Sequence, residues 1–434
     1  MEIIKRQSDF TKNILTLMTG TAIAQAIPIA ISPILTRLYR PEDFGVFALF
    51  VAIISVLANT ANGRYELAIM LPKKDEDAIN IFALGFIITC LISSLLFFVV
   101  LLFNDYFVKL LGNEEIGFWL YFIPITVFFS GLYNILNYFN NRRKCYKDLR
   151  NAAILKSIVL AVIQVSIGLV KQGATGLISG QIVSNLFANI KLLNNILKNK
   201  VLISKISMAK MIALAKKYKK FPKYSLPSSF VDDLTLQMNS LLLPRIFNLT
   251  VSGYFFLAQK IVNMPASLIA NAVSQVYFQK LSDNKNKKIL SFGFYLSTIK
   301  KLFLIALPLA IIIYLFSPFM FSLIFGEQWR VSGEIAQYLA WIFLIRFIVS
   351  PLSISFSVSM EVQKSALWKY IYFISTSFLF LFITLFNISF DTFLLFFLWH
   401  EIVLYLLYFY MITKTVKKID SDILNLRKNK LCVE

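Results

Sequence analysis

Histidine and cysteine are scarce in this chain, and their scarcity excludes several kinds of chemistry. His400 is the single histidine among 434 residues, so neither a metal site built from several histidines nor a nucleophile–histidine–acid triad can form. Three cysteines (Cys90, Cys145 and Cys432) are too few and too scattered to predict a disulfide framework. A Gly-rich phosphate loop of the Walker type is also missing, so we expect no bound cofactor and no ATP hydrolysis by this chain.

Long polar stretches are missing as well, which leaves almost no room for a soluble catalytic domain. The run Asp75-Glu76-Asp77 fits the bare D-x-D pattern of sugar transferases, but three solvated charges in a short loop explain it more simply. Hydrophobic residues make up 58% of the chain and form about twelve stretches of roughly 20 residues or more, each able to cross a hydrocarbon core as a helix. The runs are continuous rather than alternating, which excludes a barrel. We therefore predict an all-α polytopic membrane protein that is not an enzyme, with spans near 13–36, 44–70, 78–103, 117–138, 152–171, 174–197, 224–245, 251–278, 292–317, 334–358, 366–389 and 391–413.

Acidic residues are in the minority: Lys and Arg number 44 against 23 Asp and Glu, and the formal net charge is +21. If the N-terminus faces the cytoplasm, most of these basic residues fall in the connections on that same side. This asymmetry is the positive-inside rule, so the charge indicates topology rather than a nucleic-acid partner. Both termini are predicted to be cytoplasmic, and only six basic residues lie on the opposite side: Arg37, Arg40, Lys109, Lys171, Arg245 and Arg330.

An internal repeat indicates how the spans are organised. Residues 35–49 resemble residues 243–257, which lie 208 positions later in the chain. An even number of spans separates the two copies, so the halves have the same orientation and are related by an axis along the membrane normal, with a substrate path between them. The matched pairs are Leu35 and Leu243, Arg37 and Arg245, Gly45 and Gly253, Phe47 and Phe255, and Leu49 and Leu257.

The repeat predicts four regions. An N-terminal six-helix lobe covers 1–197, a basic cytoplasmic connector 198–223, a C-terminal six-helix lobe 224–413 and a cytoplasmic tail 414–434. The connector mixes lysines with apolar residues between 205 and 221. This pattern suits a helix lying on anionic membrane lipids, and a solvated linker is an equal alternative.

Ionisable residues inside the spans are the candidate functional residues, because burying charge in a membrane is costly. The basic ones are candidates for holding a phosphate-bearing substrate, since guanidinium groups bind phosphate oxygens through paired donors. The acidic ones and the histidine are candidates for balancing that charge or for coupling to protons. The basic candidates are Arg64, Lys260, Arg346, Arg37 and Arg245, and the others are Glu66, Asp232, Asp233, Glu401 and His400.

Each of these residues also has a structural explanation. Arg37 and Arg245 could snorkel to the interface, and Arg64 could form a structural pair with Glu66. Lys260 and Arg346 could pair with Asp232 or Asp233 between helices. His400 beside Glu401 could support a contact within the bundle. We nevertheless expect that Arg64→Ala or Arg346→Ala abolishes transport.

Several stretches resemble the Wzx-type polysaccharide flippases of the multidrug/oligosaccharidyl-lipid/polysaccharide (MOP) exporter superfamily. The resemblance extends over essentially the whole chain, and the second of these stretches is the most specific. They are LTRLYRPEDFGVFAL (35–49), RYELAIMLPKKDEDA (64–78), GYFFLAQKIVNMP (253–265), FGEQW (325–329) and SPL (350–352).

The resemblance implies a MATE-like fold of twelve helices in two lobes around a central, typically cationic cavity. It implies movement of undecaprenyl-pyrophosphate-linked oligosaccharides from the cytoplasmic to the periplasmic leaflet of a bacterial inner membrane. The product would be O-antigen of lipopolysaccharide, capsule or another exopolysaccharide, and the polymerase machinery would be a partner. The sugars and the coupling ion stay open.

Three other classes compete with this interpretation. The closest is a cation-coupled multidrug or metabolite antiporter of the same superfamily, although the first span has only Gln25 as a strongly polar candidate. A major-facilitator transporter ranks lower because 63–66 reads Gly-Arg-Tyr-Glu instead of the Asp-Arg-x-Gly-Arg pattern. A membrane polymerase or ligase ranks lower because the longest external connections, near 104–116 and 318–333, are short.

Overall fold

The computed structural model describes residues 19–431, without the side chains of 265–268, 271, 362 and 426–431. Within this range the chain is helical and contains no β-strand, which confirms the all-α prediction. By internal packing the chain divides into two compact units, Met1–Gly253 and Tyr254–Glu434. The lobe boundaries predicted from the repeat stay a prediction.

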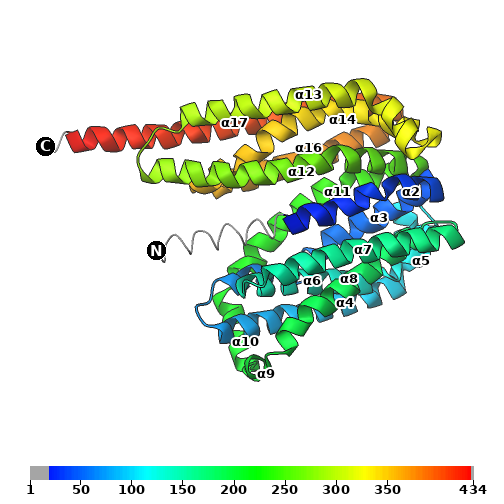
Figure 1. The fold of residues 1–434 in the computed structure, drawn as a ribbon, viewed down its shortest axis with the longest axis horizontal. Coiled ribbons are helices and arrows are strands. Elements are labelled where there is room, and N and C mark those ends of the chain that lie inside the picture. The colour runs from blue at the N-terminus through cyan, green and yellow to red at the C-terminus, as the bar shows by residue number, and fades with distance from the viewer. Residues whose placement is uncertain (1–18, 432–434) are drawn as a thin grey trace. The chain divides into compact units, whose positions relative to one another are not determined.

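The first unit is a bundle in which α7 and α8 pack along each other and α6 lies against both α4 and α8 (Figure 1). It opens with helical residues 19–30 and closes with the first turn of α12. Its elements are α2 (Ser32–Leu38), α3 (Pro41–Ala58), the 3-10 helix η1 (Tyr65–Met70), α4 (Asp75–Leu111), α5 (Ile116–Leu120), α6 (Ile123–Arg142), α7 (Tyr146–Val170), α8 (Thr175–Leu197), α9 (Lys200–Ile203), α10 (Met208–Lys217), the π-helix η2 (Phe221–Ser225), α11 (Leu226–Ile246) and the start of α12 (Leu249–Asn286).

In the second unit α13 and α14 form an antiparallel pair, and α17 packs against α14 and α16 (Figure 1). Short 3-10 helices join the longer ones, and α17 is a single helix to the end of the described chain. The elements after α12 are α13 (Phe292–Phe325), η3 (Glu327–Trp329), α14 (Arg330–Val349), η4 (Ser350–Ile354), α15 (Ser355–Val358), α16 (Val362–Leu385) and α17 (Phe390–Leu431).

Eight helical segments of the described chain are long and apolar enough to cross a membrane. Four further helices have spanning length but carry more amide and charged side chains: α6, α8, α11 and α12. With the eight, they account for the twelve predicted spans, and the chain is a multi-pass helical membrane protein. The eight are Thr19–Leu38, Pro41–Ala58, Asp75–Leu111, Tyr146–Val170, Phe292–Phe325, Glu327–Val358, Gln363–Leu385 and Phe390–Asn425.

The second predicted span, 44–70, is wrong at its C-terminal end. The helix α3 stops at Ala58, and a run of turns leads into η1. Gly63 and Arg64 both have left-handed backbone conformations, with φ of 61° and 62°. Glycine adopts this region without a steric penalty, and the Asn and Gly residues between 59 and 63 favour turns. Arg64 therefore lies outside the regular helix that the hydropathy predicted.

Several other helices run further than the hydropathy indicated. The helix α4 continues to Leu111 with a kink at Phe103, and α13 continues to Phe325 through Pro308 and Pro318. The predicted external connections are correspondingly shorter, because both helices continue past the ends of the predicted spans.

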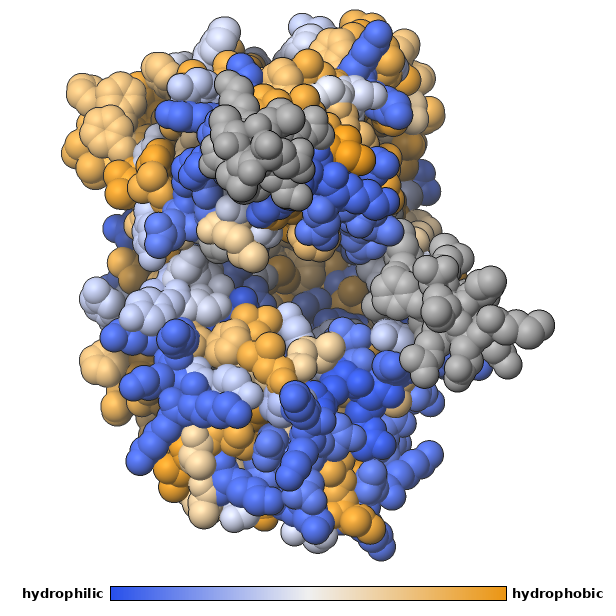
Figure 2. All heavy atoms as spheres, turned by 90° about the vertical axis from the view of Figure 1, so that its left-hand side faces the viewer, coloured by the Kyte–Doolittle hydropathy of each residue, from blue (hydrophilic) through white to orange (hydrophobic). Residues whose placement is uncertain are grey.

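The connector is folded onto the first unit rather than extended. Met211 and Leu214 of α10 are buried, and Leu214 joins a core with residues of η1, α4 and α6. The Asn80 amide of α4 donates to the Lys205 carbonyl at 3.0 Å and accepts from the Ser207 N–H at 2.8 Å. The end of this unit that carries α9 and α10 is mostly hydrophilic, with apolar side chains in between (Figure 2).

Candidate functional site

The first candidate group is the pair formed by Arg64 and Glu66 at the start of η1. Arg64 Nη1 lies 3.4 Å from Glu66 Oε1, and the two side chains are 21% and 3% exposed. Arg64 Nε and Glu66 Oε2 are both buried without a hydrogen-bond partner in the described chain. A guanidinium has five N–H donors in a fixed fork, so this single long contact leaves binding capacity unused. Arg64 can therefore bind an anionic ligand while Glu66 stays beside it.

The next residue links this pair to the connector. The Tyr65 hydroxyl donates to the Ala215 carbonyl of α10 at 3.2 Å, and the Tyr65 side chain is buried. On the other side of η1, Arg142 donates to the carbonyls of Ile69 and Pro72 at 3.2 and 2.8 Å and binds Asp75 at 3.0 Å. The backbone that presents Arg64 is thus held from two sides.

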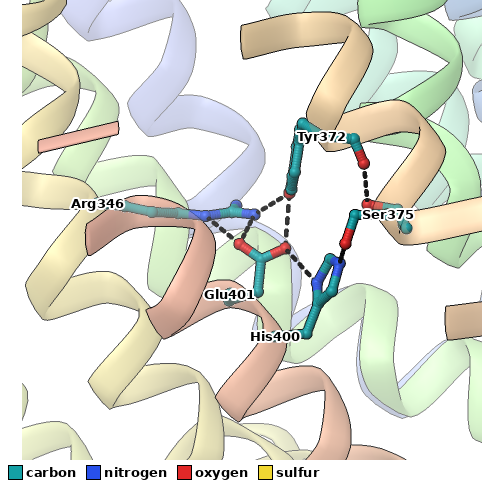
Figure 3. A network of polar contacts seen from close by, with 6 residues as sticks. Arg346, Tyr372, Ser375, His400 and Glu401 are labelled. Atoms are coloured by element: carbon teal, nitrogen blue, oxygen red, sulfur yellow. Dashed lines mark hydrogen bonds and ion pairs between the residues drawn. The ribbon is translucent and has the colours of Figure 1, made fainter. Parts of the chain in front are cut away.

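The second candidate group is a closed network in the second unit (Figure 3). Arg346 of α14 donates from Nε and Nη2 to Glu401 Oε2, at 3.1 and 2.6 Å. Arg346 Nη2 also donates to the Tyr372 hydroxyl at 2.7 Å, which in turn donates to Glu401 Oε1 at 2.6 Å. His400 lies beside Glu401, with Nδ1 3.9 Å from Oε1, and its Nε2 is 2.9 Å from Ser375 Oγ.

Aromatic rings enclose this network. The Arg346 guanidinium lies over the Tyr405 ring, 5.2 Å from its centroid. Trp368 stacks on Tyr372 and on Tyr408, with centroid separations of 5.6 and 4.3 Å. Glu401 is fully buried, so its charge must be compensated by Arg346 and the Tyr372 hydroxyl. Arg346 is therefore largely committed to partners inside the protein.

The remaining candidates are placed separately. On α11, Asp233 accepts a hydrogen bond from the Asn59 amide at 3.1 Å, and Asp232 is half-buried next to it. Lys260 is half-buried on α12. Arg37 is exposed in the last turn of α2, and Arg245 is exposed and donates to the Leu110 carbonyl. Of the acidic candidates, Glu401 is the one that pairs with Arg346. The sequence analysis gave Glu401 as a candidate for balancing charge.

The structure adds residues that the sequence analysis missed. Tyr372, Ser375 and Tyr405 complete the network around Glu401, and Tyr65 ties η1 to the connector. Aromatic and small hydroxyl residues in an apolar stretch resemble ordinary core residues. The one sequence signal for these residues is the presence of charged residues nearby in the same stretches. Among the described residues, no three His, Cys, Asp or Glu side chains are grouped to hold a metal ion.

Comparison with known proteins places the chain in a family. Residues 34–334 match the family of polysaccharide biosynthesis proteins. A stretch of 131 residues, 30% of this chain, is 28% identical to the teichuronic acid biosynthesis protein TuaB of Bacillus subtilis (strain 168). That stretch spans about a quarter (27%) of TuaB.

Solved structures of the MOP superfamily share the fold. A multidrug resistance MATE family transporter in its inward-facing conformation aligns with a TM-score of 0.65 and 15% identity, over 93% of this chain and 96% of that chain. A MOP superfamily transporter from Pyrococcus furiosus, described as having a binding pocket of reversed polarity, aligns with a TM-score of 0.64 and 14% identity over 94% and 96%. The family match confirms the resemblance noted in the sequence, and the solved structures share the fold that this resemblance implied. The chain belongs to the polysaccharide biosynthesis protein family and has the helical fold of the MOP-superfamily transporters.

Proposed function

We propose that this protein flips oligosaccharide units linked to undecaprenyl pyrophosphate from the cytoplasmic to the outer leaflet of a bacterial cytoplasmic membrane. Family membership supports a substrate used in polysaccharide biosynthesis. The observation that carries the proposal is Arg64, whose guanidinium keeps a buried nitrogen without a partner beside a buried carboxylate.

The chemistry of such a substrate fits this side chain. A pyrophosphate cannot cross hydrocarbon unaided, because an unpaired buried charge is very costly. A guanidinium provides parallel donors for phosphate oxygens, and a low local dielectric strengthens the attraction. In the proposed cycle Arg64 holds the pyrophosphate and Glu66 keeps the empty site neutral, while Lys260, Arg37 and Arg245 are secondary basic contacts. Asp232 and Asp233 are proposed to balance charge.

The lobes 1–197 and 224–413 are proposed to rock against each other, with the termini in the cytoplasm. The connector 198–223 has one buried face and a second face with exposed apolar residues, where Met208 and Ile212 are 64% and 49% exposed. With its lysines, this face is proposed to lie on anionic lipid headgroups.

The closest alternative is a cation-coupled antiporter for small molecules. The observation that favours it is the network of Glu401 and His400, which could carry a proton. Under the flippase proposal, Glu401 and His400 either couple transport to protons or support the packing of the helices. O-antigen, capsule and other glycans are all compatible products.

A leaflet assay in liposomes tests the proposal. Purified protein is reconstituted with undecaprenyl-pyrophosphate oligosaccharide, and sugar in the outer leaflet is followed with a non-permeant lectin or glycosidase. We expect protein-dependent exposure beyond the fraction accessible at the start. Arg330→Ala is the matched control for losing one positive charge, because Arg330 is 61% exposed and pairs with Glu327 and Glu334. No exposure together with drug efflux from the same vesicles would favour the antiporter.

A further inference from the structure

A groove lies between α4 and the start of α6 in the first unit. Its volume is about 510 Å³, within the range of about 300–1,000 Å³ that ligand sites occupy. The helix α4 is a candidate membrane span in which most apolar side chains are not buried, so a ligand can enter the groove from the bilayer. The lining includes the small residues Cys90, Ser93 and Ser94 and the aromatic residues Phe97, Tyr121 and Phe128.

Close contacts between helices frame this groove at both ends. At one end α4 touches α6, because a side chain added at Gly131 would lie 2.9 Å from the methyl carbon of Thr89. At the other end the Asn104 amide of α4 donates to the Gly117 carbonyl of α5 at 3.0 Å, and Asn104 is buried. Between these contacts, the small side chains of α4 leave space that larger ones would fill. The groove is therefore built into the packing of these helices and exists without a ligand.

The depth of the groove follows from its position along α4. The connector contacts α4 near its start, at Asn80. At the rise of an α-helix, Cys90 to Phe98 lie about 15–27 Å further along, and a hydrocarbon core is about 30 Å thick. The groove thus belongs to the half of the membrane away from the connector, which the charge distribution predicts to be the outer half. Lipid headgroups stay at the membrane surface, so a hydrocarbon chain is the part of a lipid that reaches the groove.

A buried hydroxyl in the groove has no hydrogen-bond partner. Ser93 is 8% exposed, and its Oγ forms no hydrogen bond with the part of the chain that the structure describes. The hydroxyl of Thr89, one turn earlier, instead donates to the Gly85 carbonyl at 2.7 Å. An unpaired hydroxyl in apolar surroundings is costly. The π electrons of a double bond can accept a weak hydrogen bond, whereas a saturated chain offers no acceptor. The groove therefore favours a chain that carries double bonds.

We propose that this groove, the tail groove, binds the polyprenyl chain of the lipid-linked substrate. The inference rests on the proposed function, which supplies a substrate with such a chain. A polyprenyl chain has a double bond in every isoprene unit, so one of them can lie against Ser93. Its rigid double bonds also leave fewer rotations to be lost on binding than a saturated chain of the same length. Arg64 and the tail groove thus bind the charged and the apolar ends of one molecule.

Photo-crosslinking with a polyprenol tests the tail groove without the pyrophosphate. The purified full-length protein in phosphatidylglycerol nanodiscs is irradiated with a diazirine-bearing undecaprenol, and the labelled peptides are identified by mass spectrometry. We expect labels on 90–98 of α4 and on 121–128, although acyl chains are present in large excess. Added undecaprenol should reduce this labelling several-fold. Hydrogenated undecaprenol has the same length and branches but no double bonds, and it should compete about two- to fivefold less well, the equivalent of one weak hydrogen bond.

Two substitutions test the lining residues. Ser94 is exposed in the groove, so Ser94→Phe should fill the space without crowding the core and reduce labelling more than about tenfold, as for two or more methylene groups left unburied. Leu95→Phe is the matched control, because Leu95 is 62% exposed on the same helix and lies outside the groove lining. Ser93→Ala should keep the labelling and remove the difference between undecaprenol and its hydrogenated form. Size-exclusion chromatography checks that each variant is folded.

The outcomes separate the tail groove from the proposed function. Labels that fall outside these two segments, or labelling that Ser94→Phe leaves unchanged, would overturn the tail groove. Equal competition by undecaprenol and its hydrogenated form would overturn the choice of a polyprenyl chain. If the labelling behaves as expected but the parent protein moves no lipid-linked sugar in liposomes, the tail groove stands and the flippase proposal fails. If the parent flips the substrate and the groove takes no label, the flippase proposal stands and the tail groove fails.

Discussion

Two arginine–glutamate pairs in this molecule differ in how many hydrogen bonds hold them. Arg64 and Glu66 share one contact of 3.4 Å, and each keeps a buried atom without a partner. Arg346 and Glu401 share two hydrogen bonds and are joined by Tyr372, with aromatic rings around them. A loosely paired guanidinium can bind a ligand, whereas one held by both a carboxylate and a hydroxyl stabilises the bundle. Substitutions in the two pairs and in their surroundings test this distinction.

Removing Glu401 should have the largest effect. Glu401→Ala leaves the Arg346 charge without its partner, which costs about 3–5 kcal/mol for a buried pair. We expect a strong loss of folded protein, measured as the thermal unfolding midpoint and the yield of monodisperse protein in detergent. The double variant Arg346→Met with Glu401→Met should recover most of that loss. A single variant as stable as the parent would show that the pair is not structural.

Removing Arg64 should affect transport rather than stability. Charge-assisted hydrogen bonds contribute about 1.5–3 kcal/mol each, so Arg64→Ala should slow flipping roughly 10–100-fold. The unfolding midpoint should fall less than in Glu401→Ala, because burial raises the pKa of Glu66 and its carboxyl can take up a proton once Arg64 is absent. Arg64→Lys should restore part of the activity, since it keeps the charge and loses the paired donors. Equal loss of stability in Arg64→Ala and Arg346→Ala would remove the distinction between the two pairs.

Removing one hydroxyl tests how closely the second pair is held. Tyr372→Phe deletes a group that donates to Glu401 and accepts from Arg346, which should cost about 1–3 kcal/mol of stability because charged partners lose a bond. Tyr370→Phe is the control, because Tyr370 is 41% exposed on the same helix. Thermal unfolding of the two variants side by side gives the comparison. Equal midpoints would mean that the hydroxyl contributes nothing measurable.

The smallest effect is expected at Glu361, which precedes α16. Burial alone would raise the pKa of this carboxyl, but hydrogen bonds from Lys364, Lys418 and Thr415 outweigh it and lower the pKa to about 2. A lowered pKa means that the ionised carboxylate stabilises the fold above its ordinary value of 4.5 and that this contribution is lost as the pH falls toward 2. Glu361→Gln should therefore lower the unfolding midpoint slightly at pH 7, and the difference should shrink below about pH 4. A difference that grows on acidification would contradict the assignment.

Much of the architecture follows from hydropathy and charge. The apolar stretches predicted the helices because a spanning helix must satisfy its backbone internally and bury few charges. The prediction failed at Arg64 because 44–70 is apolar on average, while the turn at Gly63 depends on local backbone conformation. The sequence identified Arg64, Arg346 and Glu401 as candidate residues but did not give their partners. Those partners depend on how each helix is rotated about its axis. They also depend on Tyr372, which the pattern of apolar residues does not distinguish from an ordinary core residue.

Arg64 is expected to bind the pyrophosphate, and the Arg346–Glu401 pair is not. Binding of undecaprenyl pyrophosphate to the purified protein tests it directly, by native mass spectrometry of the parent, Arg64→Ala and the double variant Arg346→Met with Glu401→Met. We predict at least about tenfold weaker binding for Arg64→Ala, the equivalent of one lost charge-assisted contact, and parent-like binding for the double variant. Unchanged binding in Arg64→Ala, or loss of binding in the double variant alone, would contradict the account.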